Sequence, residues 1–284
     1  GPTFSPPTPV STPPTFGQQG ITGSTPPPVP VTVTATVDSK VYDGTTVAKL
    51  SGATLVGANG TATLANATAG TFAGKNVGAA IPVTTSMTLT GSGASLFTLT
   101  QPNLVGTIFA KSLSVFSASV NSKVYDGSAS AVVSGAQLQP EAPGTGNGTD
   151  GKYYTGDAVV LIGGGSGTFA NKNAGTQAVT TTMTLGGADA GNYTISQPAL
   201  TGTITAKNLQ IGGMSVAASK IYDGSTGTVL LTGAGFGTTA TTGIGTSGDG
   251  LAYTIDDVQV DAGGVGTYNS KNVGSAASVS FSGV

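Results

Sequence analysis

The chain has 284 residues, enough for about two or three domains that each bury a core. Charged residues make up only 8%, the net charge is −2, and Cys, His, Trp and Arg are absent. Without an imidazole base, a thiolate nucleophile or a clustered positive charge, we expect no enzyme, no metal or other cofactor, and no nucleic-acid partner.

The remaining composition favours β-strands and an exported protein. Gly accounts for 46 residues, and Thr, Ser, Ala and Val dominate the rest. Because β-branched side chains fit a pleated sheet and crowd a helical turn, we expect an all-β protein. No apolar run reaches the roughly 18 residues that a membrane-spanning helix needs, so we expect no membrane span. Low charge together with many Gly and Thr residues favours an extracellular location over the cytosol.

Residues 1–30 form a proline-rich arm. Proline fixes φ and removes a backbone donor, so we expect an extended, polyproline-like segment. Its prolines stand at positions 2, 6, 7, 9, 13, 14, 26, 27, 28 and 30.

A five-residue motif then occurs three times. Its copies are Lys40-Val41-Tyr42-Asp43-Gly44, Lys123-Val124-Tyr125-Asp126-Gly127 and Lys220-Ile221-Tyr222-Asp223-Gly224. In such a motif Asp accepts turn amides, Gly takes a positive φ, and the Tyr ring is expected to pack under the turn. The tyrosines are 83 and 97 residues apart. Because solenoid coils repeat roughly every 20–30 residues, this spacing favours separate domains.

A second signature follows every copy of the motif, and a third signature follows the first two copies. The second pairs a Gly-Thr-aromatic run with Lys-Asn, as Lys75-Asn76, Lys172-Asn173 and Lys271-Asn272. The third contains Gln-Pro and then Gly-Thr-Ile, and it occurs only twice, at 101–108 and 197–204. The third copy therefore lacks the closing strands.

Alternating apolar and polar residues, as in 31–37, predict half-buried strands. About seven such strands per unit, separated by Gly-rich turns, are typical of an immunoglobulin-like β-sandwich. We therefore predict the arm at 1–30 and sandwich repeats at 31–112, 113–208 and 209–284. Regions 140–156 and 238–250 are predicted to be variable loops inserted into the second and third repeats.

The three signatures together resemble the YDG-type repeats of large bacterial surface proteins. Those repeats are often tandem modules of filamentous haemagglutinin-like adhesins secreted by the two-partner route. The resemblance covers about residues 31–284. It implies stalk or spacer modules at the bacterial surface or in a secreted fibre. Such modules extend the protein and link its parts mechanically rather than bind a receptor.

Most lysines stand at recurring positions. They are Lys40, Lys75, Lys111, Lys123, Lys172, Lys207, Lys220 and Lys271. In a chain so poor in charge, we predict that Lys40, Lys75 or Lys111 forms an ion pair with Asp43. A covalent alternative is an isopeptide bond from Lys75 or Lys40 to Asn76 or Asp43.

The sequence thus predicts a structural or interaction protein, the stalk or fibre-forming region of an extracellular bacterial adhesin. The alternative is a module that binds a host or matrix glycan or protein through loops 140–156 and 238–250, with tyrosines 153, 154 and 253 as stacking residues. The carboxylates at 256, 257 and 261 are interpreted as a solvated loop rather than as a glycosidase pair or a calcium site. Glycosylation sequons begin at Asn59, Asn66, Asn147 and Asn192.

A repeat without its closing strands exposes core residues and unpaired strand edges. The arm contains Phe16 and Ile21 in a segment that resembles the closing strands. We therefore hypothesise that the arm donates a strand to the third repeat of a neighbouring copy. Donor and acceptor lie at opposite ends of the chain, so the contact would build head-to-tail fibres.

Overall fold

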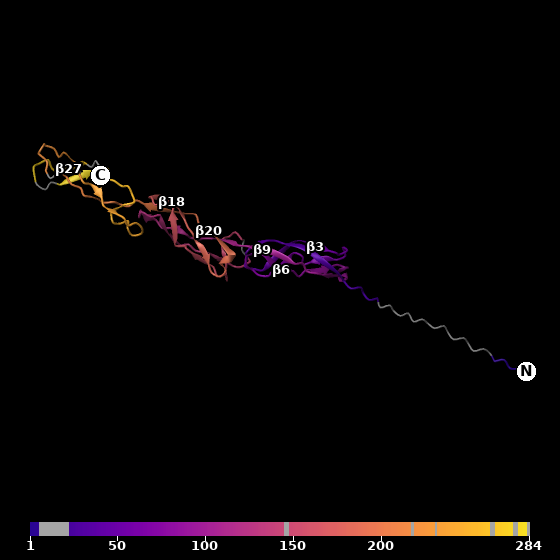
Figure 1. Ribbon diagram of the computed structural model, residues 1–284. Coiled ribbons are helices and arrows are strands. Elements are labelled where there is room, and N and C mark those ends of the chain that lie inside the picture. Colours follow the sequence, from indigo (N-terminus) through magenta and orange to yellow (C-terminus); the bar gives the residue numbers. More distant parts are fainter. Residues whose placement is uncertain are drawn as a thin grey trace.

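The computed structural model describes residues 1–5, 23–144, 148–216, 219–230, 232–261, 265–274 and 278–282. The all-β prediction is confirmed, since these residues form strands and only two short 3₁₀ turns, η1 (Ala94–Leu96) and η2 (Ala190–Asn192). Three units follow one another along a line (Figure 1). Phe16 and Ile21 lie outside the described residues.

Unit 1 is a mixed sheet curled into a half-barrel, with strand order β2-β9-β6-β5-β3-β1-β8. A separate two-stranded ribbon pairs β4 with β7. The strands are β1 (Val29–Val37), β2 (Lys40–Val41), β3 (Val47–Val56), β4 (Thr63–Ala65), β5 (Ala69–Phe72), β6 (Gly78–Thr84), β7 (Thr88–Thr90), β8 (Phe97–Leu99) and β9 (Leu104–Phe109).

Unit 2 repeats this plan with the order β11-β13-β17-β18-β21-β12. The long β1 is replaced by two shorter strands, of which the first pairs in parallel with β20. The strands are β10 (Lys111–Ser114), β11 (Ser119–Val120), β12 (Lys123–Val124), β13 (Ser130–Ser134), β14 (Pro140–Glu141), β15 (Tyr153–Tyr154), β16 (Val160–Ile162), β17 (Ser166–Phe169), β18 (Gly175–Thr180), β19 (Thr184–Gly186), β20 (Tyr193–Ser196) and β21 (Leu200–Thr205).

Unit 3 is smaller, and its largest sheet has the order β23-β27-β28. No counterpart of β12, β19, β20 or β21 occurs among its described residues. The strands are β22 (Ile211–Gly212), β23 (Thr228–Leu230), β24 (Gly235–Phe236), β25 (Thr238–Thr239), β26 (Ala252–Tyr253), β27 (Val265–Tyr268) and β28 (Val279–Ser282).

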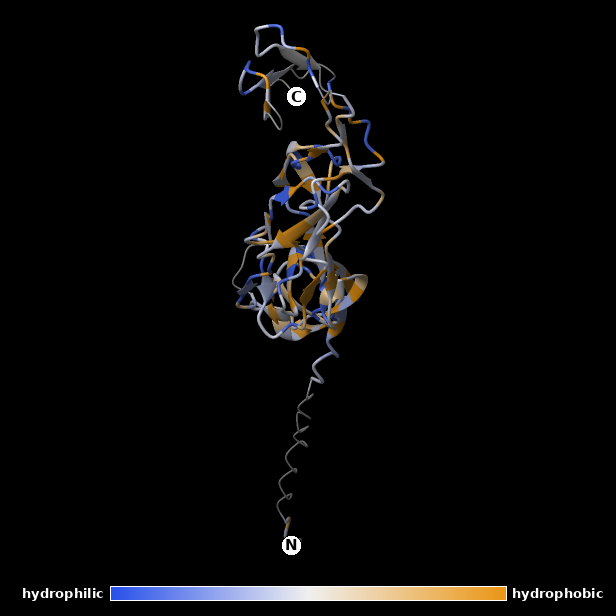
Figure 2. Ribbon diagram, turned by 90° about the vertical axis from the view of Figure 1, so that its left-hand side faces the viewer, coloured by the Kyte–Doolittle hydropathy of each residue, from blue (hydrophilic) through white to orange (hydrophobic). Residues whose placement is uncertain are grey.

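Alternation along the strands produces the core, as predicted. In β1 the side chains of Val31 and Val33 are buried, and in β9 so is that of Ile108. Hydrophobic residues lie on the strands of the first two units (Figure 2). The closing strand needs glycine, because a Cβ on Gly106 would lie 2.8 Å from the Phe72 ring.

The Gln-Pro signature also has a local explanation. The Gln101 side chain accepts a hydrogen bond from the Met87 amide at 3.1 Å and donates one to the Met87 carbonyl at 2.8 Å. Gln197 makes the same two bonds with Met183. The amide side chain thus pairs with backbone that no neighbouring strand covers.

The two inserted regions are not free loops. The first contains the short parallel pair β14 with β15, and the second begins with β25, which pairs in parallel with β26 just beyond its end. Both regions lead into the same pattern, Asp-Gly-x-x-Tyr-Thr-x-Asp, at 150–157 and 249–256. Unit 1 has no such insertion.

Candidate functional site: the joints between units

The Lys-Val-Tyr-Asp-Gly motif is a turn held by its aspartate. The Asp43 carboxylate accepts the Thr45 amide and hydroxyl, each at 2.9 Å. Lys40 Nζ donates to Asp43 Oδ1 and to the Thr45 carbonyl, both at 2.8 Å. Gly44 has a φ of +75°. The predictions of an Asp-capped turn, a left-handed glycine and a Lys40–Asp43 ion pair are confirmed.

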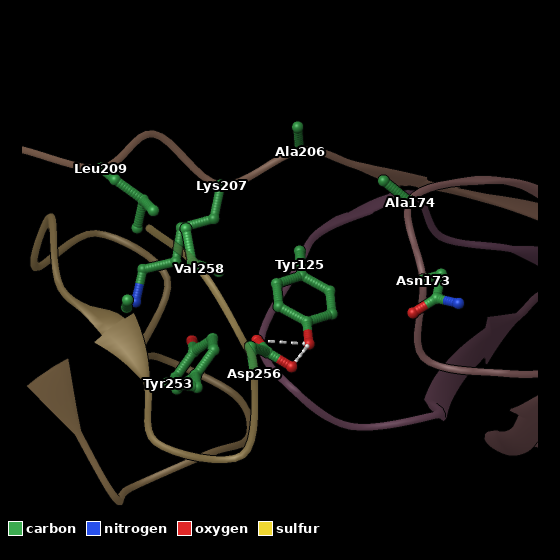
Figure 3. Close-up of a pocket in the computed structure, with 10 residues that line it drawn as sticks. Tyr125, Asn173, Ala174, Ala206, Lys207, Leu209, Tyr253, Asp256 and Val258 are labelled. Atoms are coloured by element: carbon green, nitrogen blue, oxygen red, sulfur yellow. Dashed lines mark hydrogen bonds between the residues drawn. The ribbon is translucent and has the colours of Figure 1, made fainter. Parts of the chain in front are cut away.

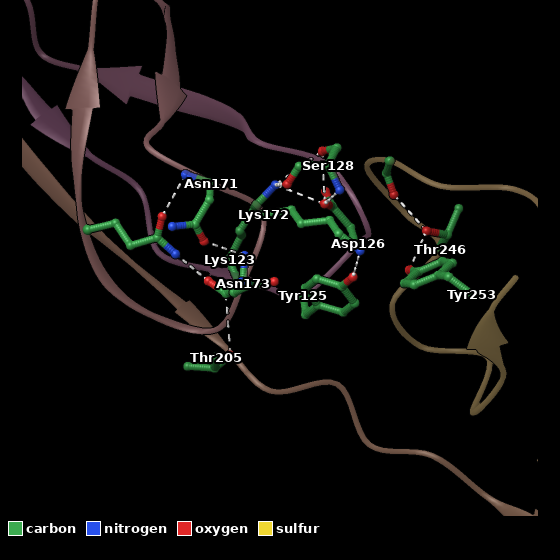
Figure 4. Close-up of polar contacts among 12 residues, drawn as sticks. Lys123, Tyr125, Asp126, Ser128, Asn171, Lys172, Asn173, Thr205, Thr246 and Tyr253 are labelled. Atoms are coloured by element: carbon green, nitrogen blue, oxygen red, sulfur yellow. Dashed lines mark hydrogen bonds and ion pairs between the residues drawn. The ribbon is translucent and has the colours of Figure 1, made fainter. Parts of the chain in front are cut away.

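The other two copies form the same turn. Asp126 accepts the Ser128 amide and pairs with Lys123 at 2.8 Å, beside Gly127 at φ +76° (Figure 4). Asp223 accepts the Ser225 amide and pairs with Lys220 at 2.8 Å, beside Gly224 at φ +77°.

The prediction that the tyrosine packs under its own turn is wrong for Tyr42. The fully buried Tyr42 ring lies against two rings of the next unit, 5.8 Å from Tyr154 and 5.3 Å from Tyr193 between centroids. Both angles are tilted or edge-on, as aromatic pairs prefer. The motif therefore supplies one half of a joint between units.

Asp157 is the centre of this first joint. Its carboxylate accepts hydrogen bonds from Tyr42 Oη at 2.8 Å, Tyr193 Oη at 2.7 Å and Lys75 Nζ at 2.7 Å. Burial raises the pKa of Asp157, but the bonds from Lys75 and the two tyrosines outweigh burial and leave the pKa below its ordinary value. Burial and the bond to Asp157 raise the pKa of Tyr42 to about 12.

Lys111 forms a second ionic cluster beside the first. Its fully buried side chain pairs with Glu141 and with Asp150, the latter at 2.9 Å, and Nζ lies 4.2 Å from the centre of the Tyr154 ring. Burial lowers the pKa of Lys111, but these carboxylates outweigh it and leave the pKa raised. Lys111 therefore remains charged inside the joint, matched by two carboxylates and an aromatic face.

An asparagine pair completes the first joint. Asn192 Oδ1 accepts the Val77 amide at 2.9 Å, and Asn192 Nδ2 donates to Asn76 Oδ1 at 3.1 Å. Both ends of the Asn192 amide are thus occupied and the residue is buried. A glycan on Asn192 is incompatible with this fold, whereas Asn59 and Asn66 are exposed and Asn147 lies outside the described residues.

The second joint repeats the first with equivalent residues. Tyr125 Oη donates to Asp256 at 2.7 Å, and Lys172 Nζ pairs with Asp256 and donates to Tyr125 Oη at 2.9 Å. The Tyr125 and Tyr253 rings lie 5.7 Å apart. The interpretation of Asp256 as a solvated residue is wrong, because this bridging carboxylate is only 16% exposed.

The Lys111 cluster of the first joint has a counterpart in the second joint as well. Lys207 Nζ pairs with Asp249 at 2.7 Å and lies 3.9 Å from the centre of the Tyr253 ring. Among the described residues no second carboxylate pairs with Lys207, because Thr239 takes the place of Glu141. Backbone also closes both joints, since Gly144 donates to the Asp43 carbonyl at 2.9 Å and Gly243 to the Asp126 carbonyl at 2.8 Å.

A comparison with protein families identifies the repeats. A model described as "YDG domain" matches residues 26–103 and 110–201. The chain belongs to the YDG domain family. No curated protein matches the chain.

The matched YDG domains contain the first two Tyr-Asp-Gly turns, and the third turn lies beyond them. There Tyr222 is 59% exposed, and Lys271 and Asn272 are exposed. Unit 3 therefore presents the first half of a joint, and no residue that the structure describes covers it.

Sequence reasoning placed the recurring lysines correctly but missed most partners. Lys40, Lys75 or Lys111 was expected to pair with Asp43, and of these three Lys40 does. Lys75 pairs instead with Asp157, and Lys111 with Glu141 and Asp150. Asn76 contacts Asn192 rather than a lysine. The repeated pattern Asp-Gly-x-x-Tyr-Thr-x-Asp was the signal that could have revealed these partners.

No described helix is long and apolar enough to cross a membrane. No group of three or more His, Cys, Asp or Glu side chains that could hold a metal ion occurs in the described part of the chain.

Proposed function

We propose that this chain is the stalk or fibre-forming repeat region of an extracellular bacterial adhesin, a structural protein rather than an enzyme. The observation that carries the proposal is the repeated joint, in which each insertion packs its Tyr and Asp against the Tyr-Asp-Gly turn of the preceding unit. A chain of globular units acts as a spacer when its joints resist bending.

The chemistry of the joints supports stiffness. Each joint combines an aromatic pair, worth about 0.5–1.5 kcal/mol beyond area burial, with ion pairs and two or more inter-unit hydrogen bonds. The segment that links units 1 and 2 is also held in place, because it contains Lys111, whose ammonium group is buried. By contrast, domains connected only by exposed linkers are expected to move independently.

Small-angle X-ray scattering tests the stalk proposal. We expect the chain to scatter as one rod, and the double variant Asp157→Ala/Asp256→Ala to become shorter on average and more flexible. Asp257→Ala is the matched control, because Asp257 is exposed beside Asp256. If the unmodified chain is already as flexible as the double variant, the stalk proposal is wrong.

The alternative function, ligand binding by regions 140–156 and 238–250, has weaker support. Both regions pack into joints, and the rings of Tyr154 and Tyr253 are 0% and 1% exposed. They are therefore not available to stack on a glycan, which leaves Tyr153, whose side chain is half-buried. A glycan array with a Tyr153→Ala control tests this alternative, and selective binding lost in the variant would favour it over the stalk.

Fibre formation through the arm remains a separate proposal, supported by the lack of counterparts of β19, β20 and β21 among the described residues of unit 3. Deleting residues 1–23 tests it in electron micrographs. Fibres that form equally well without the arm would exclude donation by Phe16 and Ile21.

We also propose an immunoglobulin-like sandwich as the architecture of each unit. Its support is the β4–β7 ribbon, whose Leu64 packs against the core of the curled sheet as a short second layer. An experimental structure in which the β4–β7 and β16–β19 ribbons do not face the main sheets would exclude it.

A further inference from the structure

A cavity of about 320 Å³ lies in the second joint. Tyr125 stands in its middle, with Leu209 and Val258 on one side and Asn173 on the other (Figure 3). This volume lies within the range of small-ligand pockets, roughly 300–1,000 Å³.

The equivalent space in the first joint is filled by the protein itself. There β20 pairs in parallel with β10, with Tyr193 opposite Lys111. The Tyr193 ring packs edge-on against Tyr42, and its hydroxyl donates to Asp157 at 2.7 Å. That hydroxyl also accepts the amide of Tyr154 at 2.9 Å. Asn192, one residue earlier, binds the loop of unit 1.

The walls of the second cavity match the residues that Tyr193 and its strand cover in the first joint. Val159 is 9% exposed, whereas its counterpart Val258 is 44% exposed. Leu113 is fully buried, whereas its counterpart Leu209 is half-buried. Residues 207–210, the counterpart of β10, form no strand. No described segment of unit 3 occupies this space.

The polar groups that bind the Tyr193 hydroxyl in the first joint have counterparts at this cavity. Asp256 accepts one tyrosine hydroxyl, from Tyr125, whereas Asp157 accepts two. The amides of Ala252 and Thr254 donate into the β25–β26 pair, so the Tyr253 amide between them points away from it. In the first joint the corresponding Tyr154 amide meets the incoming tyrosine hydroxyl.

We propose that this cavity is an acceptor site for a β-strand of the type Asn-Tyr-Thr-Ile, the closing segment of a YDG repeat. The strand pairs in parallel with residues 207–210, and its tyrosine stacks on Tyr125 and donates to Asp256. Its asparagine binds Asn173 and the amide of Ala174, as Asn192 binds Asn76 and Val77. Main-chain pairing supplies affinity, and the Asn and Tyr pockets supply specificity.

A labelled peptide tests the site on the full chain. The peptide copies residues 189–198, and fluorescence anisotropy reports its binding. We expect saturable binding below about 1 mM and at least a tenfold weaker affinity when the peptide tyrosine is replaced by alanine. A second arm joins the same segment to the C-terminus through a Gly/Ser linker, which raises its effective concentration to the millimolar range.

A matched pair of chain variants locates the binding. Val258→Glu places a carboxylate in the cavity, and Val132→Glu places one on the outer face of β13; both valines are 44% exposed. We expect the first variant to abolish peptide binding and the second to leave it unchanged. Equal binding to both variants, or no binding in either arm, overturns the proposal.

The competing occupant is the arm of a second copy. If the arm fills the cavity, the full chain self-associates with rising concentration in analytical ultracentrifugation. Both the deletion of residues 1–23 and the substitution Val258→Glu would then abolish self-association. That outcome overturns the Asn-Tyr-Thr-Ile assignment. We expect instead that the peptide binds the arm-deleted chain as tightly as the full chain.

Discussion

Tyr42 and Asp157 are 115 residues apart in the chain, yet the Tyr42 hydroxyl donates a 2.8 Å hydrogen bond to the Asp157 carboxylate. The bond crosses from unit 1 to unit 2. Tyr125 and Asp256, 131 residues apart, form the same bond between units 2 and 3. In the first two Tyr-Asp-Gly motifs the tyrosine therefore connects two units, while the Asp and Gly shape the turn that presents it.

Replacing Asp157 by alanine is expected to weaken the first joint. Three donors, from Tyr42, Tyr193 and Lys75, lose their shared acceptor inside a site where the carboxylate is only 3% exposed. We expect a loss of about 1–3 kcal/mol in the free energy of unfolding, measured with urea. Hydrogen exchange should show faster exchange at the Tyr154 and Val77 amides, with unit 3 unaffected. Unchanged exchange at both amides would contradict the role of Asp157.

Acid is expected to loosen the first joint. Burial raises the pKa of Asp150, but its ion pair with Lys111 and the hydrogen bond from the Lys152 amide outweigh burial and lower the pKa from 3.8 to about 2. Because the folded-state pKa lies below the unfolded value, the carboxylate stabilises the fold above about pH 4 and loses this effect as the pH falls toward about 2. The pKa of Asp157 is lowered as well, so both groups act in the same direction.

Thermal unfolding at pH 7 and pH 3 measures this effect. We expect a lower Tm at pH 3, and a smaller drop in Asp150→Asn, which has no carboxylate to titrate at this position. An equal drop in the variant would show that other groups cause the acid sensitivity.

The three motif glycines form a matched series for alanine substitution. Gly44, Gly127 and Gly224 have nearly the same φ, between +75° and +77°, so each substitution carries the same left-handed strain of about 1 kcal/mol. Their surroundings differ. A Cβ on Gly127 would lie 2.7 Å from Thr242 and one on Gly44 3.1 Å from Pro143, whereas a Cβ on Gly224 would meet no described atom within 4 Å beyond its chain neighbours.

We therefore expect the loss of stability to follow the order Gly127→Ala, Gly44→Ala, Gly224→Ala, from largest to smallest, in urea unfolding. Equal losses would mean that only the turn matters and that the contacts across the joints contribute nothing.

The recurring lysines are expected to remain non-covalent. Lys40 Nζ is satisfied by Asp43 and Thr45, and Lys75 Nζ is directed to Asp157 rather than to Asn76. Intact-protein mass spectrometry should therefore give the sequence mass. A deficit of one water or one ammonia would instead establish an isopeptide bond, and fragmentation would locate it.

Local features of this protein could be predicted from the sequence. The turn at Asp43 involves residues within five positions of one another, so residue type and spacing determine it. The strands of the core follow from alternation in the same way, and the all-β fold follows from composition. The three-fold recurrence of the Tyr-Asp-Gly motif followed from the sequence as well.

Only the tertiary structure decided where the motif tyrosines and the inserted regions lie. Tyr42 and Asp157 meet because unit 2 places its insertion against the end of unit 1, and no local spacing encodes that distance. Asp256 was interpreted as a solvated loop residue because a segment of low hydrophobicity can form either a loop or an ionic joint between units. Burial of Asp157 and Lys111 depends on partners from another unit, so it arises only when the two units pack together.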